Sequence, residues 1–146
     1  MRLKQLSRPV ATLVMCLSLG CGVTSAFADS VVVVVSAKSS LAGLTGDQVS
    51  QLFLGKTGTF PNGEPAVPID QADGPGKDAF YSKVTGKDSA QLRAYWSQLI
   101  FTGKAKPPKA VADSGEVKKL ISANPNMIGY IDKGAVDGSV KVVLTP

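Results

Sequence analysis

Five consecutive valines at residues 31–35 constrain the fold more than any other part of the sequence. A continuous β-branched run, bounded here by Ser30 and Ser36, is typical of a strand that is buried on both faces. Such a strand lies inside a sheet that helices cover on both sides. The run therefore predicts a layered α/β domain.

Helix and strand signals alternate along the rest of the chain. Thr45 and Gln48 have the spacing of a capping box, and we expect their helix to end at Gly55. Further strands are predicted at residues 66–69, 127–131 and 140–144, and further helices at about 75–84, 90–101 and 114–123. Residues 104–109 are basic and proline-rich, which indicates a solvated loop. This order predicts a three-layer α/β sandwich with a largely parallel sheet.

The first 28 residues have the pattern of a secretory signal peptide. Three basic residues precede a mostly apolar stretch at 10–23, and Ala26-Phe27-Ala28 has the small-x-small pattern of a cleavage site. The apolar stretch is too short for a membrane anchor. We therefore expect cleavage after Ala28, export to the periplasm, and a single domain over residues 29–146. A lipoprotein attached through Cys21 is the alternative, although Ser18 stands where a lipidation site has a branched residue.

Cleavage changes the composition of the chain. The remaining 118 residues contain neither cysteine nor histidine, and their 13 basic and 11 acidic residues give a net charge of +2. They therefore lack a thiolate nucleophile, the commonest general base and the commonest transition-metal ligands. We expect a protein that is not an enzyme, has no cofactor or metal, and has no nucleic-acid partner.

Residues 70–80 contain the strongest candidate for a binding site. Two glycines and Pro75 form a tight turn between a strand and a helix. Such a turn directs backbone N–H groups and the positive end of a helix dipole at one point, which suits an anion. Lys77 adds a positive charge, and Asp73 can accept a proton from a partly protonated ligand. The alternative is an ordinary loop in which Asp73 caps its own helix.

Four blocks of sequence, in this order, resemble the phosphate-binding subunits of bacterial ABC transporters, which are type II periplasmic binding proteins. They are the helix at 44–56, the strand and turn at 69–80, Trp96, and the segment 126–131. The resemblance covers residues 31–143. Members of that family have two lobes with the ligand between them, whereas this chain is long enough for one. The resemblance thus implies one lobe of a periplasmic binding protein-like fold.

The resemblance also implies that the turn binds phosphate or a related oxyanion. Gln71 stands where the family has an arginine, Pro75 where it has a serine and Lys77 where it has a threonine. Because a guanidinium fork and two hydroxyl donors are missing, we expect weaker binding than in the family. The expected ligand-binding residues are Gln71, Asp73, Gly74, Gly76, Lys77 and Asp78, with Ser39 and Ser40 converging on the same rim.

Two functions follow from this sequence. The first is an exported, non-enzymatic solute-binding protein for phosphate or a related oxyanion, working with an ABC permease. The alternative is a periplasmic interaction module that kept the lobe but lost high-affinity binding, and that pairs with itself as a homodimer or with an envelope protein. For this alternative we expect Phe60, Tyr81 and Tyr95 to be exposed on the contact face.

Overall fold

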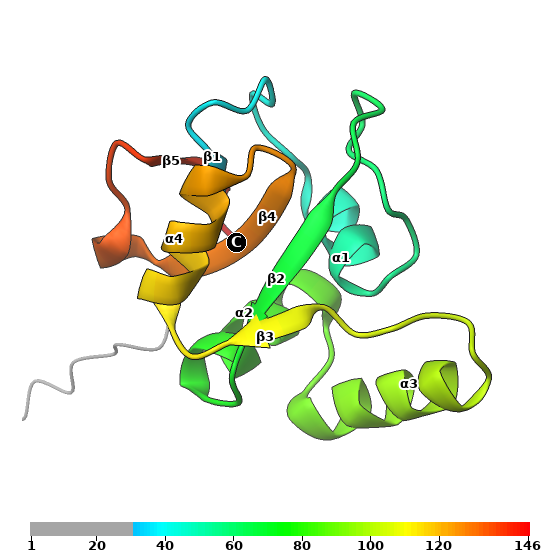
Figure 1. Ribbon diagram of the computed structural model, residues 1–146. Coiled ribbons are helices and arrows are strands. Elements are labelled where there is room, and N and C mark those ends of the chain that lie inside the picture. The colour runs from blue at the N-terminus through cyan, green and yellow to red at the C-terminus, as the bar shows by residue number, and fades with distance from the viewer. Residues whose placement is uncertain (1–30) are drawn as a thin grey trace, which may run out of the picture.

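The computed structural model describes residues 31–146, which form one five-stranded sheet with helices on both faces (Figure 1). The predicted signal peptide and its cleavage site after Ala28 lie outside the described residues. The elements, in chain order, are β1 (Val31–Ser36), α1 (Gly46–Phe53), β2 (Val67–Gln71), α2 (Pro75–Thr85), α3 (Ser89–Phe101), β3 (Lys109–Val111), α4 (Ser114–Ala123), β4 (Met127–Asp132), the 3-10 turn η2 (Lys133–Ala135) and β5 (Val140–Leu144).

The sheet has the strand order β3-β2-β4-β1-β5. β2 pairs in parallel with both β3 and β4, whereas β1 pairs antiparallel with both β4 and β5. Four strands therefore point in one direction and β1 runs against them, which confirms the prediction of a largely parallel sheet. The reversed β1 has a consequence for the site, because its last residue, Ser36, lies at the opposite end of the sheet from Gln71 at the end of β2.

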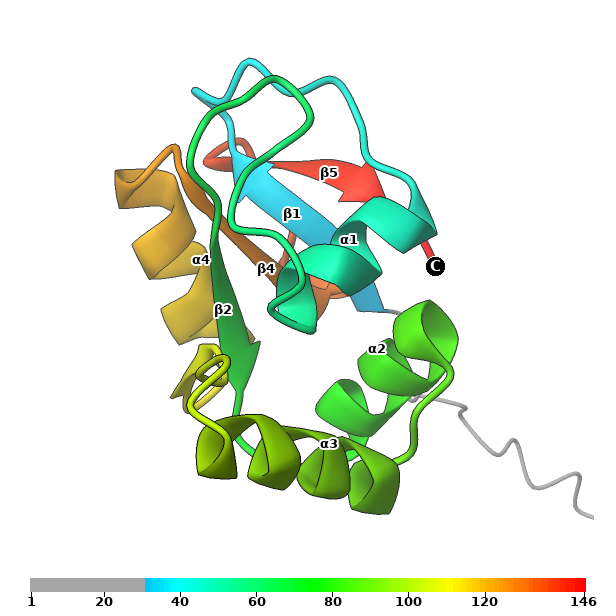
Figure 2. The same ribbon diagram turned by 90° about the vertical axis from the view of Figure 1, so that its right-hand side faces the viewer.

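The valine run of β1 builds the cores on both faces of the sheet. Val31, Val33 and Val35 pack on one face with residues of α1 and α2. Val32 and Val34 pack on the other face with residues of α4. Figure 2 shows the resulting three layers, with α4 on one side of the sheet and α1 and α2 on the other. All six residues of β1 are buried, as the uninterrupted β-branched pattern predicts.

Local sequence signals set the helix boundaries. Thr45 and Gln48 form the predicted capping box of α1, and Asp88 and Gln91 form a second one at the start of α3. Gly55 follows α1 with φ +68°, in the left-handed region that glycine tolerates best. A Cβ atom there would also lie 3.2 Å from the Trp96 ring, so this position requires glycine for two reasons.

Two expectations from the sequence are wrong. The loop expected at residues 104–109 ends at residue 108, because Lys109 begins the edge strand β3, which pairs with β2. Phe60 and Tyr81 are buried rather than exposed, and Tyr95 is half-buried. On α3, Leu92 and Trp96 are buried, Tyr95 and Leu99 are half-buried against the core, and Ile100 is exposed.

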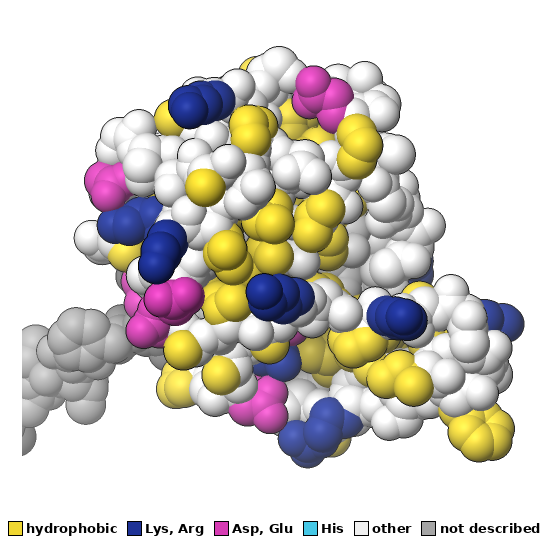
Figure 3. Space-filling model, viewed as in Figure 1, with side chains coloured by type: hydrophobic (Ala, Val, Ile, Leu, Met, Phe, Trp, Pro, Cys, Tyr) yellow, Lys and Arg dark blue, Asp and Glu magenta, His cyan; other side chains and the backbone are white. Residues whose placement is uncertain are grey.

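The C-terminal end of α3 extends away from the sheet. Phe101 is 93% exposed and Ile100 is 55% exposed. Figure 3 shows apolar side chains on the surface at the lower right, where this end of α3 lies. None of the helices within residues 31–146 is long and apolar enough to cross a membrane.

Candidate functional site

The turn between β2 and α2 leaves helix N–H groups free. Gly74 is the N-cap of α2 and supplies no side chain, and Pro75 at the first helical position has no N–H group. The first backbone bond of the helix runs from the Asp78 N–H to the Gly74 carbonyl, at 3.0 Å. Within the described part of the chain, the N–H groups of Gly76 and Lys77 make no hydrogen bond. These two donors therefore remain available at the positive end of the α2 dipole.

Asp70, at the end of β2, is the buried centre of the site. Its side chain accepts hydrogen bonds from the hydroxyl groups of Tyr81, at 3.0 Å, and of Tyr130. Asp70 is only 4% exposed, so these donors replace water around its carboxylate. Burial raises the pKa of both tyrosines well above the usual range, and the adjacent Asp70 charge raises it further. Both phenols therefore stay protonated and remain donors.

Lys77 connects this buried carboxylate to the surface. Its Nζ lies 3.4 Å from Asp70 Oδ2 and 3.1 Å from Asp73 Oδ1, and the second pair has the (i, i+4) spacing of a helix contact. Partial burial acts to lower the pKa of Lys77, but the two carboxylates outweigh it and the net pKa is raised. The lysine is therefore a fixed positive charge at the mouth of the turn.

Asp73 does not cap α2, whose N-cap is Gly74. Its side chain is 85% exposed and bonds instead to Lys77. The Lys77 hydrogen bond and charge, together with the more distant charge of Arg93, lower the pKa of Asp73 below its usual value. Asp73 is therefore an ionised carboxylate beside two cations.

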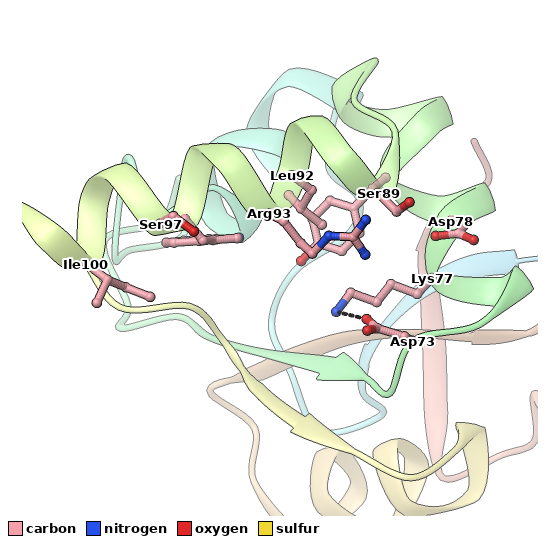
Figure 4. Close-up of a pocket in the computed structure, with 10 residues that line it drawn as sticks. Asp73, Lys77, Asp78, Ser89, Leu92, Arg93, Ser97 and Ile100 are labelled. Carbon is pink, nitrogen blue, oxygen red and sulfur yellow. Dashed lines mark hydrogen bonds and ion pairs between the residues drawn. The ribbon is translucent and has the colours of Figure 1, made fainter.

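Arg93 reaches the same place from α3, a contribution that the sequence interpretation missed. Figure 4 shows Arg93 and Lys77 projecting into one space from two different helices. Arg93 is exposed, and it makes no hydrogen bond or ion pair with any residue of the described range 31–146. The sequence did contain a signal for this position. Leu92 and Trp96 are the buried residues of α3 and fix the orientation of the helix, and Arg93 is three residues before Trp96, a spacing at which helix side chains are neighbours.

Together the two helices enclose a hollow of about 260 Å³, which we name the α2–α3 hollow. Within residues 31–146, no group of three or more acidic, histidine or cysteine side chains could hold a metal ion. The residues that line the hollow are Asp73, Lys77, Asp78, Tyr81, Ser89, Leu92, Arg93, Trp96, Ser97 and Ile100.

Gln71 points away from this hollow. Its Nε2 donates to the Tyr130 carbonyl oxygen at 2.7 Å and to Ser114 Oγ at 3.4 Å. The side chain therefore ties β2 to β4 and to the start of α4. Gln71, which stands where the phosphate-binding subunits have an arginine, therefore has a structural role here.

Ser39 and Ser40 do not converge on the turn, and that expectation is wrong. Because β1 is antiparallel to β4, the chain leaves β1 at the end of the sheet opposite the turn (Figure 1). Ser39 Oγ accepts the Leu41 N–H there, and Ser40 bonds with Asn62 and Glu64. Of the eight predicted ligand-binding residues, three line the hollow, namely Asp73, Lys77 and Asp78. The other five do not line it; they are Gly74, Gly76, Gln71, Ser39 and Ser40.

Comparison with known proteins gives matches at the level of structure. No family model matches the sequence, and no curated protein matches it either. A solved protein from Clostridium perfringens, described as a phosphate ABC transporter substrate-binding protein with bound phosphate, is 27% identical with a TM-score of 0.63. A phosphate transport receptor of the ABC type from Vibrio cholerae is 18% identical with a TM-score of 0.61, which shows the fold alone.

The matched region is only part of those proteins. It covers 79% of this chain but 44% of the Clostridium chain and 45% of the Vibrio chain. The chain therefore spans less than half the length of the proteins it matches. It resembles phosphate ABC transporter substrate-binding proteins in a single-lobe form, as the order of the four sequence blocks predicts.

Proposed function

We propose that the protein is a non-enzymatic solute-binding protein that holds phosphate or a related oxyanion in the α2–α3 hollow. The observation that carries this proposal is the position of Arg93, an exposed and unpaired cation that faces the same space as Lys77. The resemblance to a phosphate-bound protein supports the same ligand class. We further propose that the protein acts in the periplasm and delivers its ligand to an ABC permease.

The two cations have different roles in this proposal. The Arg93 guanidinium offers a planar set of five N–H donors, which can bind two oxygens of one anion. It thus supplies, from α3, the forked recognition that Gln71 cannot. Lys77 is a point charge already held by two carboxylates, and the free N–H groups of Gly76 and Lys77 belong to the same first turn of α2. Asp73 can accept a hydrogen bond from a protonated oxygen of the ligand.

Binding is expected to be weaker than in a two-lobed protein. The hollow is bordered on one side by solvent-exposed residues, including Asp73 and Arg93. Each hydrogen bond to the anion therefore competes with water, and the Asp73 carboxylate competes with the anion for Lys77. We expect dissociation constants between micromolar and millimolar.

Titration calorimetry with inorganic phosphate and with sulfate tests the proposal. Arg93→Gln removes the guanidinium without touching the buried network, and we expect phosphate binding to weaken about tenfold or more, the usual loss for a charge-assisted hydrogen bond. Lys119→Gln is the matched control, because it removes the same charge from an exposed position on α4. Absence of heat from the unmodified protein at millimolar phosphate and sulfate contradicts the proposal, as does equal weakening in the two variants.

A second candidate function is an interaction module, favoured by the exposed end of α3. Ile100 and Phe101 present apolar surface to solvent there. This function predicts self-association or capture of an envelope protein through α3. Light scattering on the purified protein, with Phe101→Ser for comparison, measures the first of these. A monomer that binds phosphate tightly argues against it.

A further inference from the structure

The α2–α3 hollow has a charged end and an apolar end. Lys77, Asp73 and Arg93 lie together near the start of α2, whereas Ile100 lies at the far end, two turns along α3 from Arg93 (Figure 4). Ser97 stands between them. The side chains at one end of the hollow are thus charged, and those at the other end are apolar.

The apolar end is built from large side chains. Trp96 and Leu92 line the hollow but are only 8% and 5% exposed, so most of each side chain belongs to the core, and Trp96 also borders a separate pocket beside Gly55 and residues 104–109. Ile100 differs, because it is 55% exposed and belongs to neither core cluster of residues 31–146. Its side chain therefore forms part of the wall of the hollow but contributes little to the core.

The size of the hollow exceeds what a bare oxyanion needs. Arg93 and Ile100 line its two ends and are seven residues apart on α3, which is about 10 Å along the helix axis. Inorganic phosphate has five non-hydrogen atoms and presents only oxygen atoms to its surroundings, so it would occupy only the charged end. The apolar end beside Trp96 and Ile100 would then stay in contact with water, at a free-energy cost that an apolar group could remove.

We infer that the ligand is an organic phosphate ester or phosphonate, whose anionic group lies between Lys77 and Arg93 and whose apolar substituent lies against Trp96 and Ile100. This inference rests on the proposed function, since it uses the same cations for the anionic group. It adds the class of substituent, which is aromatic or branched aliphatic. A site of this kind, with apolar walls and a few polar groups that orient the ligand, is usual for small molecules.

Calorimetry with inorganic phosphate, methylphosphonate and phenylphosphonate measures the contribution of the substituent. We expect phenylphosphonate to bind about tenfold more tightly than phosphate, and methylphosphonate to bind about as tightly as phosphate. A tenfold gain is about 1.4 kcal/mol. It requires about 56 Å² of apolar surface removed from water at about 25 cal/mol per Å², well within what an aromatic ring can bury.

Ile100→Ser and Phe101→Ser form the matched pair of variants. Both positions are exposed and adjacent on α3, but only Ile100 lines the hollow. We expect Ile100→Ser to reduce the preference for phenylphosphonate about threefold, with phosphate binding unchanged, and Phe101→Ser to leave both unchanged. Circular dichroism on both variants checks that α3 remains folded.

The outcomes separate the two proposals. If phosphate and phenylphosphonate bind equally, or if both variants change the preference equally, the inference about the substituent is overturned and the proposed oxyanion site stands. If no phosphate or phosphonate binds, the proposed function falls and the inference falls with it.

Discussion

α2 and α3 form the two walls of one hollow, but they are anchored in different ways. In α2, Phe80 and Tyr81 are 0% and 1% exposed, and the Phe80 ring stacks on Tyr130 with centroids 4.0 Å apart. In α3, Leu92 and Trp96 reach the core from the first half of the helix, and the second half ends in exposed Ile100 and Phe101. α2 is therefore anchored by two fully buried rings, whereas α3 is anchored by Leu92 and Trp96 and, less deeply, by half-buried Leu99.

This difference indicates how the site divides its tasks. Lys77 is held on α2 by two carboxylates, one of them buried, so its charge occupies a fixed position before any ligand arrives. Arg93 is placed by the anchored half of α3, between Leu92 and Trp96. Ile100 is exposed and belongs to neither core cluster of residues 31–146. We therefore expect recognition of the anion to tolerate little change, and recognition of the substituent to tolerate much.

The largest expected effect separates the two walls directly. Phe80→Ala removes a fully buried ring from the aromatic cluster, and we expect the free energy of unfolding to fall by about 3–5 kcal/mol. Phe101→Ala makes the same chemical change at a position that is 93% exposed, and we expect a change within about 0.5 kcal/mol. Urea unfolding followed by circular dichroism measures both. Similar losses in the two variants would show that α3 is as firmly anchored as α2.

A second measurement uses the tyrosines as probes of the same difference. Burial, reinforced by the Asp70 charge, raises the pKa of Tyr81 and Tyr130 far above the ordinary value of 10.0. A raised pKa in the folded state means that its contribution to stability is complete below pH 10 and is lost as the pH rises further. Above pH 10, each phenol that stays protonated in the folded state lowers the free energy of unfolding by about 1.4 kcal/mol for every pH unit.

The expected alkaline titration is therefore cooperative. We expect little tyrosinate absorbance just above pH 10, followed by its appearance together with unfolding. Tyr95 on α3 has a pKa that only its partial burial raises. Tyr95→Phe is the control, because it leaves the two phenols around Asp70 in place. Gradual tyrosinate formation in the folded protein of this variant would contradict the buried network.

The elements of the fold followed from local signals, whereas the composition of the site did not. The valine run, the capping boxes and Gly55 act within a few residues, so strands and helices could be predicted from them. The direction of β1 depends on which strands it pairs with, and no local pattern encodes that choice. This is why Ser39 and Ser40 were expected beside the turn and lie at the other end of the sheet.

The same limit explains the two charged residues that sequence reasoning assigned poorly. Asp70 became a buried centre only because Tyr130, sixty residues later, comes beside it on β4. Arg93 entered the site only because α3 packs against the end of α1 and turns that face toward α2. β3 was missed because three residues in a proline-rich segment gain their strand structure from pairing with β2.

The smallest expected effect compares one hydroxyl group on each helix. Tyr81→Phe removes a buried hydrogen bond to the Asp70 carboxylate, at 3.0 Å, and we expect a loss of about 1.5–3 kcal/mol in the free energy of unfolding. Tyr95→Phe removes a hydrogen bond of 2.6 Å to the Leu54 carbonyl oxygen, a neutral acceptor at a half-buried position. There we expect a loss of about 0.5–1.5 kcal/mol.

Ligand binding distinguishes the two hydroxyl groups further. Tyr81 helps to hold Asp70, and Asp70 holds Lys77, so its loss is expected to weaken phosphate binding as well as stability. The Tyr95 bond joins the middle of α3 to the end of α1 and touches no charged residue of the hollow, so its loss is expected to leave phosphate binding within about twofold. If Tyr95→Phe weakens binding more than Tyr81→Phe, then the position of Arg93 depends on that bond, and α3 is the wall that controls recognition of the anion.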